Sequence, residues 1–130
     1  MNDIRADVAV QAPSFSFVKG GETGPGTGGD FFLTWRHGDK DLHVSCDQHS
    51  SPEEAIQRLR RLRMAISAGV PDSLPGVADE AYYLGLYGWH IYFARRQFVC
   101  QVGGPGEAPT RGVAAIVIKH IDSSVREKKN

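Results

Sequence analysis

The sequence predicts an α+β fold in which an antiparallel sheet of about five to six strands carries two helices packed on one face. Several short segments alternate apolar and polar residues with the period of a strand, and two longer segments repeat apolar residues with the period of a helix. The connections between neighbouring strand-like segments are too short for the crossover that a parallel pair requires. The elements therefore follow the order hairpin, helix, meander, helix.

Length and composition indicate one globular domain. The chain has 130 residues, of which 41% are hydrophobic and 23% are charged, values that are ordinary for a folded domain. Its 15 basic and 15 acidic residues balance, whereas a nucleic-acid-binding domain usually carries a positive excess. No apolar run approaches the ~18 residues of a membrane-spanning helix. We therefore expect neither a nucleic-acid partner nor a membrane span.

The single α+β domain is expected to occupy residues 30–126. Residues 1–29 are weakly patterned and predict a flexible N-terminal segment, in which residues 15–17 alternate as an edge strand would. Residues 20–29 contain six glycines and one proline, a composition typical of a mobile loop. Residues 127–130 are predicted to fray.

The first half of this domain predicts a hairpin followed by a helix. Residues 31–36 and residues 42–47 alternate apolar and polar side chains, and the polar connection between them suits a hairpin loop. Ser51 is the expected N-cap, Pro52 takes the first helical position, and Glu54 completes a capping box. Apolar residues then recur at helical spacing, at Ala55, Ile56, Leu59, Leu62 and Ile66.

The second half predicts a meander and a closing helix. Its strands span residues 82–86, 89–95 and 98–102, and the two-residue connections between them make neighbouring strands antiparallel. Thr110 opens the helix. The apolar face of this helix is formed by Ala114, Val117, Ile118, Ile121 and Val125.

Aromatic residues of the meander supply the candidate binding surface. Because side chains alternate across a strand, we predict an outward set of Tyr83, Tyr87, His90 and Tyr92. Such amphipathic surfaces are enriched where proteins or small ligands dock, and the alternative is that these residues only pair across strands to stabilise the sheet. The sequence thus predicts a non-enzymatic binding or sensing module for an unknown protein or small ligand. An exposed hairpin or edge strand would also suit a homodimer.

An enzyme is the second hypothesis, with Cys46 or Cys100 as its nucleophile. Such a cysteine needs some exposure and an activating neighbour, here His43, His90 or His120. Both cysteines fall at apolar positions, which predicts buried free thiols, whereas a disulfide would require export and adjacent strands. We assign no catalytic residue. The charged first residues do not resemble a signal peptide, so the bacterial cytoplasm and export after removal of a signal both stay open.

Two further patterns do not predict a site. His43, Cys46 and His49 have a spacing that suggests a metal, but the first two point to opposite faces of a strand, and metal ligands must converge. Residues 21–28 lack the lysine and the following helix of a phosphate-binding loop. We therefore expect no metal and no cofactor.

The predicted first helix carries a basic cluster of four arginines: Arg58, Arg60, Arg61 and Arg63. Such a cluster could bind the phosphates of an anionic polymer. A solvated helix face with ordinary ion pairs is the interpretation we prefer, because the chain as a whole is neutral. Binding of an anionic polymer is therefore the third hypothesis.

Residues 76–82 read Gly-Val-Ala-Asp-Glu-Ala-Tyr and precede the predicted meander. This stretch resembles the Gly-x-Gly-Asp-Glu-Ala turn of small bacterial extracytoplasmic and lipoprotein-type domains of unknown function. In those domains a strand, a basic β-turn, another strand and an amphipathic helix follow, and residues 95–97 match the basic turn. The resemblance implies a non-enzymatic sensing or binding module without a catalytic residue. From the residues themselves, Asp79 and Glu80 are expected to cap the turn by accepting backbone amides.

Overall fold

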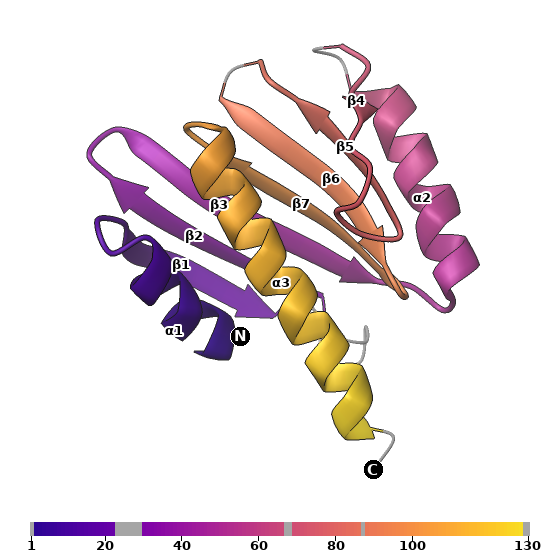
Figure 1. Cartoon of the computed structure of the whole chain (residues 1–130), viewed down its shortest axis with the longest axis horizontal. Coiled ribbons are helices and arrows are strands. Elements are labelled where there is room, and N and C mark those ends of the chain that lie inside the picture. The colour runs from indigo at the N-terminus through magenta and orange to yellow at the C-terminus, as the bar shows by residue number, and fades with distance from the viewer. Residues whose placement is uncertain (1, 23–29, 67–68, 87, 129–130) are drawn as a thin grey trace.

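The computed structural model describes residues 2–22, 30–66, 69–86 and 88–128. Its strands are β1 (Ser16–Glu22), β2 (Phe31–His37), β3 (Lys40–Gln48), β4 (Asp72–Ser73), β5 (Glu80–Leu84), β6 (Trp89–Arg95) and β7 (Phe98–Gly104). Its helices are α1 (Asn2–Gln11), α2 (Pro52–Ala65) and α3 (Glu107–Lys128). Within these residues the strands form one antiparallel sheet in the order β1-β2-β3-β7-β6-β5-β4 (Figure 1). The predicted α+β class and antiparallel sheet are confirmed. The edge strand predicted at residues 15–17 corresponds to the start of β1, β4 is an additional two-residue strand at the other edge, and α1 is a third helix.

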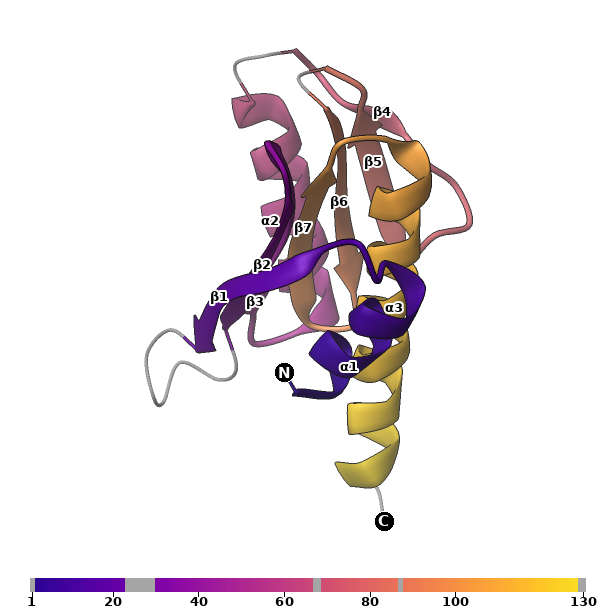
Figure 2. The same ribbon diagram turned by 90° about the vertical axis from the view of Figure 1, so that its left-hand side faces the viewer.

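The helices cover opposite faces of the sheet. Helix α2 packs on one face, whose buried residues include Tyr82, Tyr92, Ala94 and Val99. Helices α1 and α3 pack on the other face, whose buried residues include Leu33, Val44, Ile91, Phe93 and Val102. Figure 2 shows α2 on one side of the strands and α1 with α3 on the other. The prediction that both helices share one face is wrong, because strand β6 is buried on both sides along residues 91–94.

Helix α1 lies within the segment that the sequence predicted to be flexible. Ile4 and Val8, one helical turn apart, are buried in the core of the α3 face. Asp7 adds a hydrogen bond of 2.8 Å to the ring of His120 on α3. Two buried positions produce almost no amphipathic pattern, which is why the sequence did not reveal this helix. Most of the predicted glycine-rich loop, residues 23–29, lies outside the described residues.

Helix α2 begins at the predicted residues. The Ser51 hydroxyl accepts a hydrogen bond of 3.1 Å from the backbone N–H of Glu54, and Pro52 occupies the first turn. The carboxylate of Glu54 contacts the hydroxyl of Ser50. At the other end, the Arg63 side chain donates a hydrogen bond of 2.8 Å to the backbone carbonyl of Pro71. This bond connects the C-terminal turn of α2 to the segment that leads into β4.

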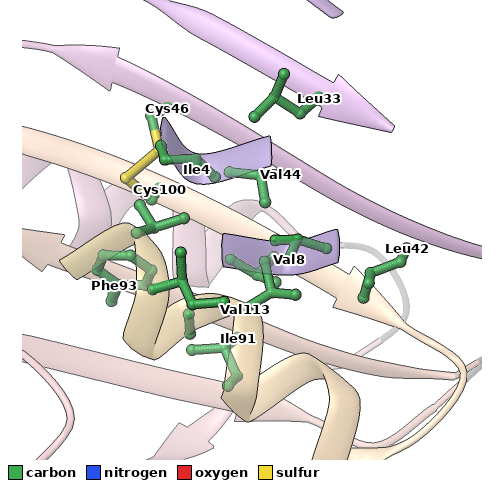
Figure 3. Close-up of a cluster of buried hydrophobic side chains, with 14 of the residues drawn as sticks. Ile4, Val8, Leu33, Leu42, Val44, Cys46, Ile91, Phe93, Cys100 and Val113 are labelled. Carbon is green, nitrogen blue, oxygen red and sulfur yellow. A yellow bond between two sulfur atoms is a disulfide. The ribbon is translucent and has the colours of Figure 1, made fainter. Parts of the chain in front are cut away.

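The two cysteines of the chain form a disulfide between the central strands (Figure 3). Cys46 of β3 and Cys100 of β7 are direct partners in the antiparallel ladder, and their Cα atoms are 4.1 Å apart. Both are buried in the core of the α3 face. The prediction of free thiols is wrong, because the sheet order places β7 directly beside β3.

Candidate functional site

The residues predicted to form one aromatic surface do not share a face of the sheet. Tyr83 lies on the side of α1 and α3, whereas Tyr92 lies beneath α2. His90 is on the side of Tyr92, since side chains two residues apart on a strand point the same way. Tyr87 lies outside the described residues. The sheet therefore separates Tyr83 from His90 and Tyr92.

Tyr92 is a core residue of the α2 face. Its side chain is 5% exposed and belongs to the cluster that contains Ala55 and Leu59 of α2. This burial raises the pKa of the phenol. The ring of His90 lies beside it, with the two ring centroids 6.4 Å apart. The expectation that Tyr92 is exposed to a partner is wrong, because α2 covers this part of the sheet.

Tyr83 stacks on Trp89 on the opposite face. The ring centroids are 5.2 Å apart, the ring planes differ by 12°, and both side chains are half-buried. The guanidinium of Arg111, near the start of α3, lies 5.6 Å from the centroid of the Trp89 ring. This distance is within the range of a cation–π contact. An aromatic pair and a cation thus meet at one end of α3.

A mainly apolar hollow of 230 Å³ lies between α3 and the loop that connects β4 to β5. Its lining consists of Gly76, Val77, Ile91, Arg111, Ala114, Ala115 and Ile118. Ile91 and Ala114 are buried and form the floor. Gly76 turns the loop with a φ of 80°, in the region that favours glycine. The stretch of residues 76–82 that the sequence singled out therefore supplies one wall of the hollow.

The aromatic pair lies next to this hollow. Ile91 of the floor pairs directly with Tyr83 across the β5–β6 ladder, and Trp89 is two residues away on the same strand and the same face. Arg111 both lines the hollow and faces the Trp89 ring. Arg111 therefore connects the hollow to the stacked rings, which are its neighbours and not part of its lining.

Arg111 is the charged member among the lining residues of the hollow. It donates a hydrogen bond of 2.8 Å to the carboxylate of Glu107, four residues earlier, and both side chains are about half exposed. Exposed pairs of this kind stabilise a protein by at most about 1 kcal/mol. The carboxylate of a ligand can therefore take the place of Glu107, and the planar fork of donors on arginine suits that geometry.

Asp79 supports the framework around the site. Its carboxylate accepts hydrogen bonds from the backbone N–H of Arg96 at 2.7 Å and from the Arg95 side chain at 2.8 Å. Arg95 also donates to both oxygens of Asp122 on α3, at 2.9 and 3.0 Å. Asp79 accepts a backbone amide, as predicted, but the turn that it caps is the β6–β7 turn and not its own turn at residues 76–82.

Glu80 connects the sheet to α2 on the opposite face. Its carboxylate accepts two hydrogen bonds from Arg60, at 2.9 and 2.8 Å, and one of 2.6 Å from the hydroxyl of Tyr82. The bound arginine lowers the pKa of Glu80. Arg63 lies over the Tyr82 ring, 4.3 Å from its centroid. These side-chain partners replace the backbone amide predicted for Glu80, and two of the four helix arginines are engaged within the chain.

The cysteine–histidine pair required by the enzymatic hypothesis is not formed. Cys46 and Cys100 are bonded to each other, so neither is a free thiol. His43 and His90 lie on the α2 face, whereas Cys100 lies in the core of the α3 face. The ring of His120 is hydrogen-bonded to α1. The structure thus offers no thiolate beside an imidazole.

The spacing of His43, Cys46 and His49 does not create a metal site either. His43 and Cys46 are three residues apart on β3 and face opposite sides of the sheet. His49 lies beyond the end of β3, with its Nδ1 atom 3.5 Å from the carboxylate of Glu54. Among the described residues, no group of three or more histidine, cysteine, aspartate or glutamate side chains is arranged to hold a metal ion.

Trp89 and Arg111 were not predicted as site residues. Trp89 was left out of the predicted outward set, and it lies on the face that α1 and α3 cover. Arg111 precedes Ala114, Ala115 and Ile118 by three, four and seven residues, which is the spacing of one helix face. A charge placed on an otherwise small and apolar helix face was the signal that could have identified this position.

No protein-family model, no curated protein and no solved structure matches this chain. None of the helices in the described part of the chain is long and apolar enough to cross a membrane. The function is therefore inferred from the geometry of the site.

Proposed function

We propose that the chain is a small non-enzymatic binding module whose ligand occupies the hollow between α3 and the β4–β5 loop. The observation that carries this proposal is the meeting of an apolar hollow, a stacked aromatic pair and one guanidinium at the same place. Ligand sites in proteins are typically concave and mostly apolar, with a few polar groups that orient the ligand. The lining of this hollow has that composition.

Its volume and charge favour a small monocarboxylic acid with an aromatic or branched aliphatic body. At 230 Å³ the hollow is larger than a cavity of about 150 Å³ that holds benzene and smaller than the sites of about 300 Å³ and above that hold drug-sized ligands. The carboxylate would replace Glu107 as the partner of Arg111, and the body of the ligand would lie over Ile91. The edge of Trp89 would border it.

Tryptophan fluorescence tests this proposal, because the Trp89 ring faces Arg111 of the hollow while Trp35, the other tryptophan, is buried in the core. In a Trp35→Phe background, phenylacetate should change the Trp89 emission in a saturable way, and the neutral analogue benzyl alcohol should bind more weakly. Arg111→Met should weaken phenylacetate binding about tenfold or more, since a hydrogen bond to a charged group contributes about 1.5–3 kcal/mol. The same variant should leave benzyl alcohol binding unchanged.

Two further variants test whether the ligand occupies the hollow. Ala115→Leu narrows the hollow from its rim and should weaken the binding of both probes. Arg58→Met is the matched control, because it removes an exposed arginine from α2, on the opposite face of the sheet. The proposal is wrong if phenylacetate leaves the Trp89 emission unchanged at millimolar concentration. It is also wrong if Arg58→Met weakens binding as much as Arg111→Met.

The Cys46–Cys100 bond supports a location in an oxidising compartment, which is also what the resemblance of residues 76–82 to extracytoplasmic domains implies. Structural disulfides persist in such compartments and are rare in a reducing cytosol. Trapping of thiols in intact cells with a maleimide of high mass tests this inference. Because both cysteines are buried, the label is applied under denaturing conditions, where the protein should acquire it only after reduction. Immediate double labelling of the denatured, unreduced protein would contradict it.

A further inference from the structure

Two imidazoles lie side by side on the α2 face of the sheet. His43 of β3 and His90 of β6 flank β7, and the ladder pairs each of them directly with Gly103. Direct partners in an antiparallel ladder share a face, so both rings project from the same side. The ring centroids are 6.2 Å apart and the ring planes differ by 48°.

Gly103 allows both rings to pack closely against the backbone of β7. A Cβ atom at this position would lie 2.3 Å from Cε1 and 2.6 Å from Nε2 of His43, and 2.9 Å from Nδ1 of His90. A larger residue would therefore collide with both rings, and with glycine here one nitrogen of each ring lies beside the same stretch of backbone. A glycine inside a strand weakens the strand and often marks the close approach of another group. Here that group is a pair of imidazoles.

We infer that His43 and His90 form a two-histidine site for a divalent late transition-metal ion, with Cu²⁺ bound most tightly. Imidazole nitrogen is a preferred ligand of copper, nickel and zinc, and among divalent first-row ions Cu²⁺ has the highest affinity for a given nitrogen site. Water would complete the coordination, since the described residues bring no third histidine, cysteine, aspartate or glutamate to this point. The site lies on the opposite face of the sheet from the hollow, so it is independent of the proposed function.

The surroundings of the two rings suit a cation. A depression of 370 Å³ leads to them, and Asp39, Asp41 and Lys40 are the charged residues of its lining. Tyr92 lies beside the His90 ring and limits its movement.

Binding of CuCl₂ to the purified chain, followed by calorimetry and by electron paramagnetic resonance, tests the inference. One Cu²⁺ ion should bind per chain, with a spectrum that shows coordination by two nitrogen atoms. Zn²⁺ should bind more weakly, and Mg²⁺, which prefers oxygen ligands, should not bind. Failure of Cu²⁺ to bind, or coordination without nitrogen, would overturn the inference.

Three substitutions locate the site. His43→Gln and His90→Gln should each weaken Cu²⁺ binding by at least about tenfold, because even the loss of an outer-shell contact can cost that much. Gly103→Ala keeps both imidazoles, but its methyl group would collide with both rings and displace them, so it should weaken binding as well. The matched control is His37→Gln, which removes an exposed histidine from the end of β2. Wild-type affinity for Cu²⁺ in His43→Gln or His90→Gln, or a loss of affinity in His37→Gln equal to theirs, would overturn the inference.

A measurement on the wild-type chain covers the case in which a variant fails to fold. Cu²⁺ is paramagnetic and broadens the NMR signals of nuclei close to it. At a small fraction of one equivalent, the first backbone amide signals to disappear should be those around His43, His90 and Gly103. Earlier loss of signals around His37 or His120 would place the ion elsewhere and overturn the inference.

Discussion

The carboxylate of Asp79 accepts a hydrogen bond of 2.7 Å from the backbone N–H of Arg96, whose φ is 54°. A non-glycine residue in this left-handed region costs about 1–2 kcal/mol. The hydrogen bond offsets part of that cost and fixes the β6–β7 turn against the loop that precedes β5. The acid of the Gly-Val-Ala-Asp-Glu-Ala stretch therefore stabilises a turn that lies 17 residues further along the chain.

Asp79→Ala should destabilise the protein by about 0.5–1.5 kcal/mol, the net contribution of a typical hydrogen bond, because the Arg96 N–H is exposed and water can replace part of the lost interaction. Asp79→Asn should cost less, because its amide oxygen can still accept the Arg96 N–H. In an Arg96→Gly background the penalty of Asp79→Ala should shrink, since glycine adopts the positive φ without help. Urea unfolding of the single and double variants measures these differences. Equal penalties in both backgrounds would show that Asp79 does not act through this turn.

The Cys46–Cys100 disulfide joins residues 54 positions apart. Closing a loop of this length in the unfolded chain is expected to stabilise the protein by about 4 kcal/mol. Reduction with a phosphine should therefore lower the free energy of unfolding by roughly this amount, measured by urea unfolding with and without the reductant. The double variant Cys46→Ala/Cys100→Ala is the control and should not respond to the phosphine. An equal response of the variant would mean that the reductant acts elsewhere.

Strand β6 shows why the fold class could be predicted and the arrangement of layers could not. The alternation of Trp89, Ile91 and Phe93 with polar-tipped neighbours predicted a strand, and residues 89–95 form one. The same stretch is continuously buried along residues 91–94, and such a run indicates a strand covered on both faces. Tyr92 was predicted to face solvent because it alternates with Ile91 and Phe93 along the strand, and a sheet covered on one face would leave that side exposed.

The candidate site was predicted in part for a related reason. Tyr83 was identified from the alternation of its strand, which is a local property. Its partnership with Trp89 and Arg111 depends on where α3 crosses the sheet, and the disulfide depends on β7 lying next to β3. Strand order is set by contacts between residues far apart in the chain, which periodicity does not report.

Asp122 gives the stability of the protein an acid-dependent component. The hydrogen bond and the charge of Arg95 lower the pKa of this carboxyl below its ordinary value of 3.8. A lowered pKa means that the ionised carboxylate is favoured more in the folded protein than in the unfolded chain. The contribution of ionised Asp122 to the free energy of unfolding is therefore present above about pH 4 and is lost as the pH falls through the folded-state pKa. Asp122→Asn should therefore be less stable at neutral pH, and its difference from the wild-type chain should shrink in acid.

Urea unfolding at a series of pH values measures this convergence. Asp39→Asn, at an exposed aspartate in the β2–β3 turn, is the matched control and should run parallel to the wild-type profile. A difference between Asp122→Asn and the wild-type chain that stays constant down to about pH 2 would contradict the expectation.

His43 should make the protein less stable just below neutral pH. Its burial and the adjacent His90 lower its pKa from the ordinary value of 6.5, although Asp41 partly opposes them. As the pH falls through 6.5, the unfolded chain therefore takes up a proton at this residue before the folded protein does, and the free energy of unfolding decreases until the folded-state pKa is passed. His43→Gln should remove this decrease, while exposed His37→Gln should retain it. Thermal unfolding at a series of pH values measures the effect, in the presence of a chelator that prevents any contribution from bound metal. If the stability of His43→Gln changed with pH in parallel with that of the wild-type chain, His43 would titrate alike in the folded and unfolded states.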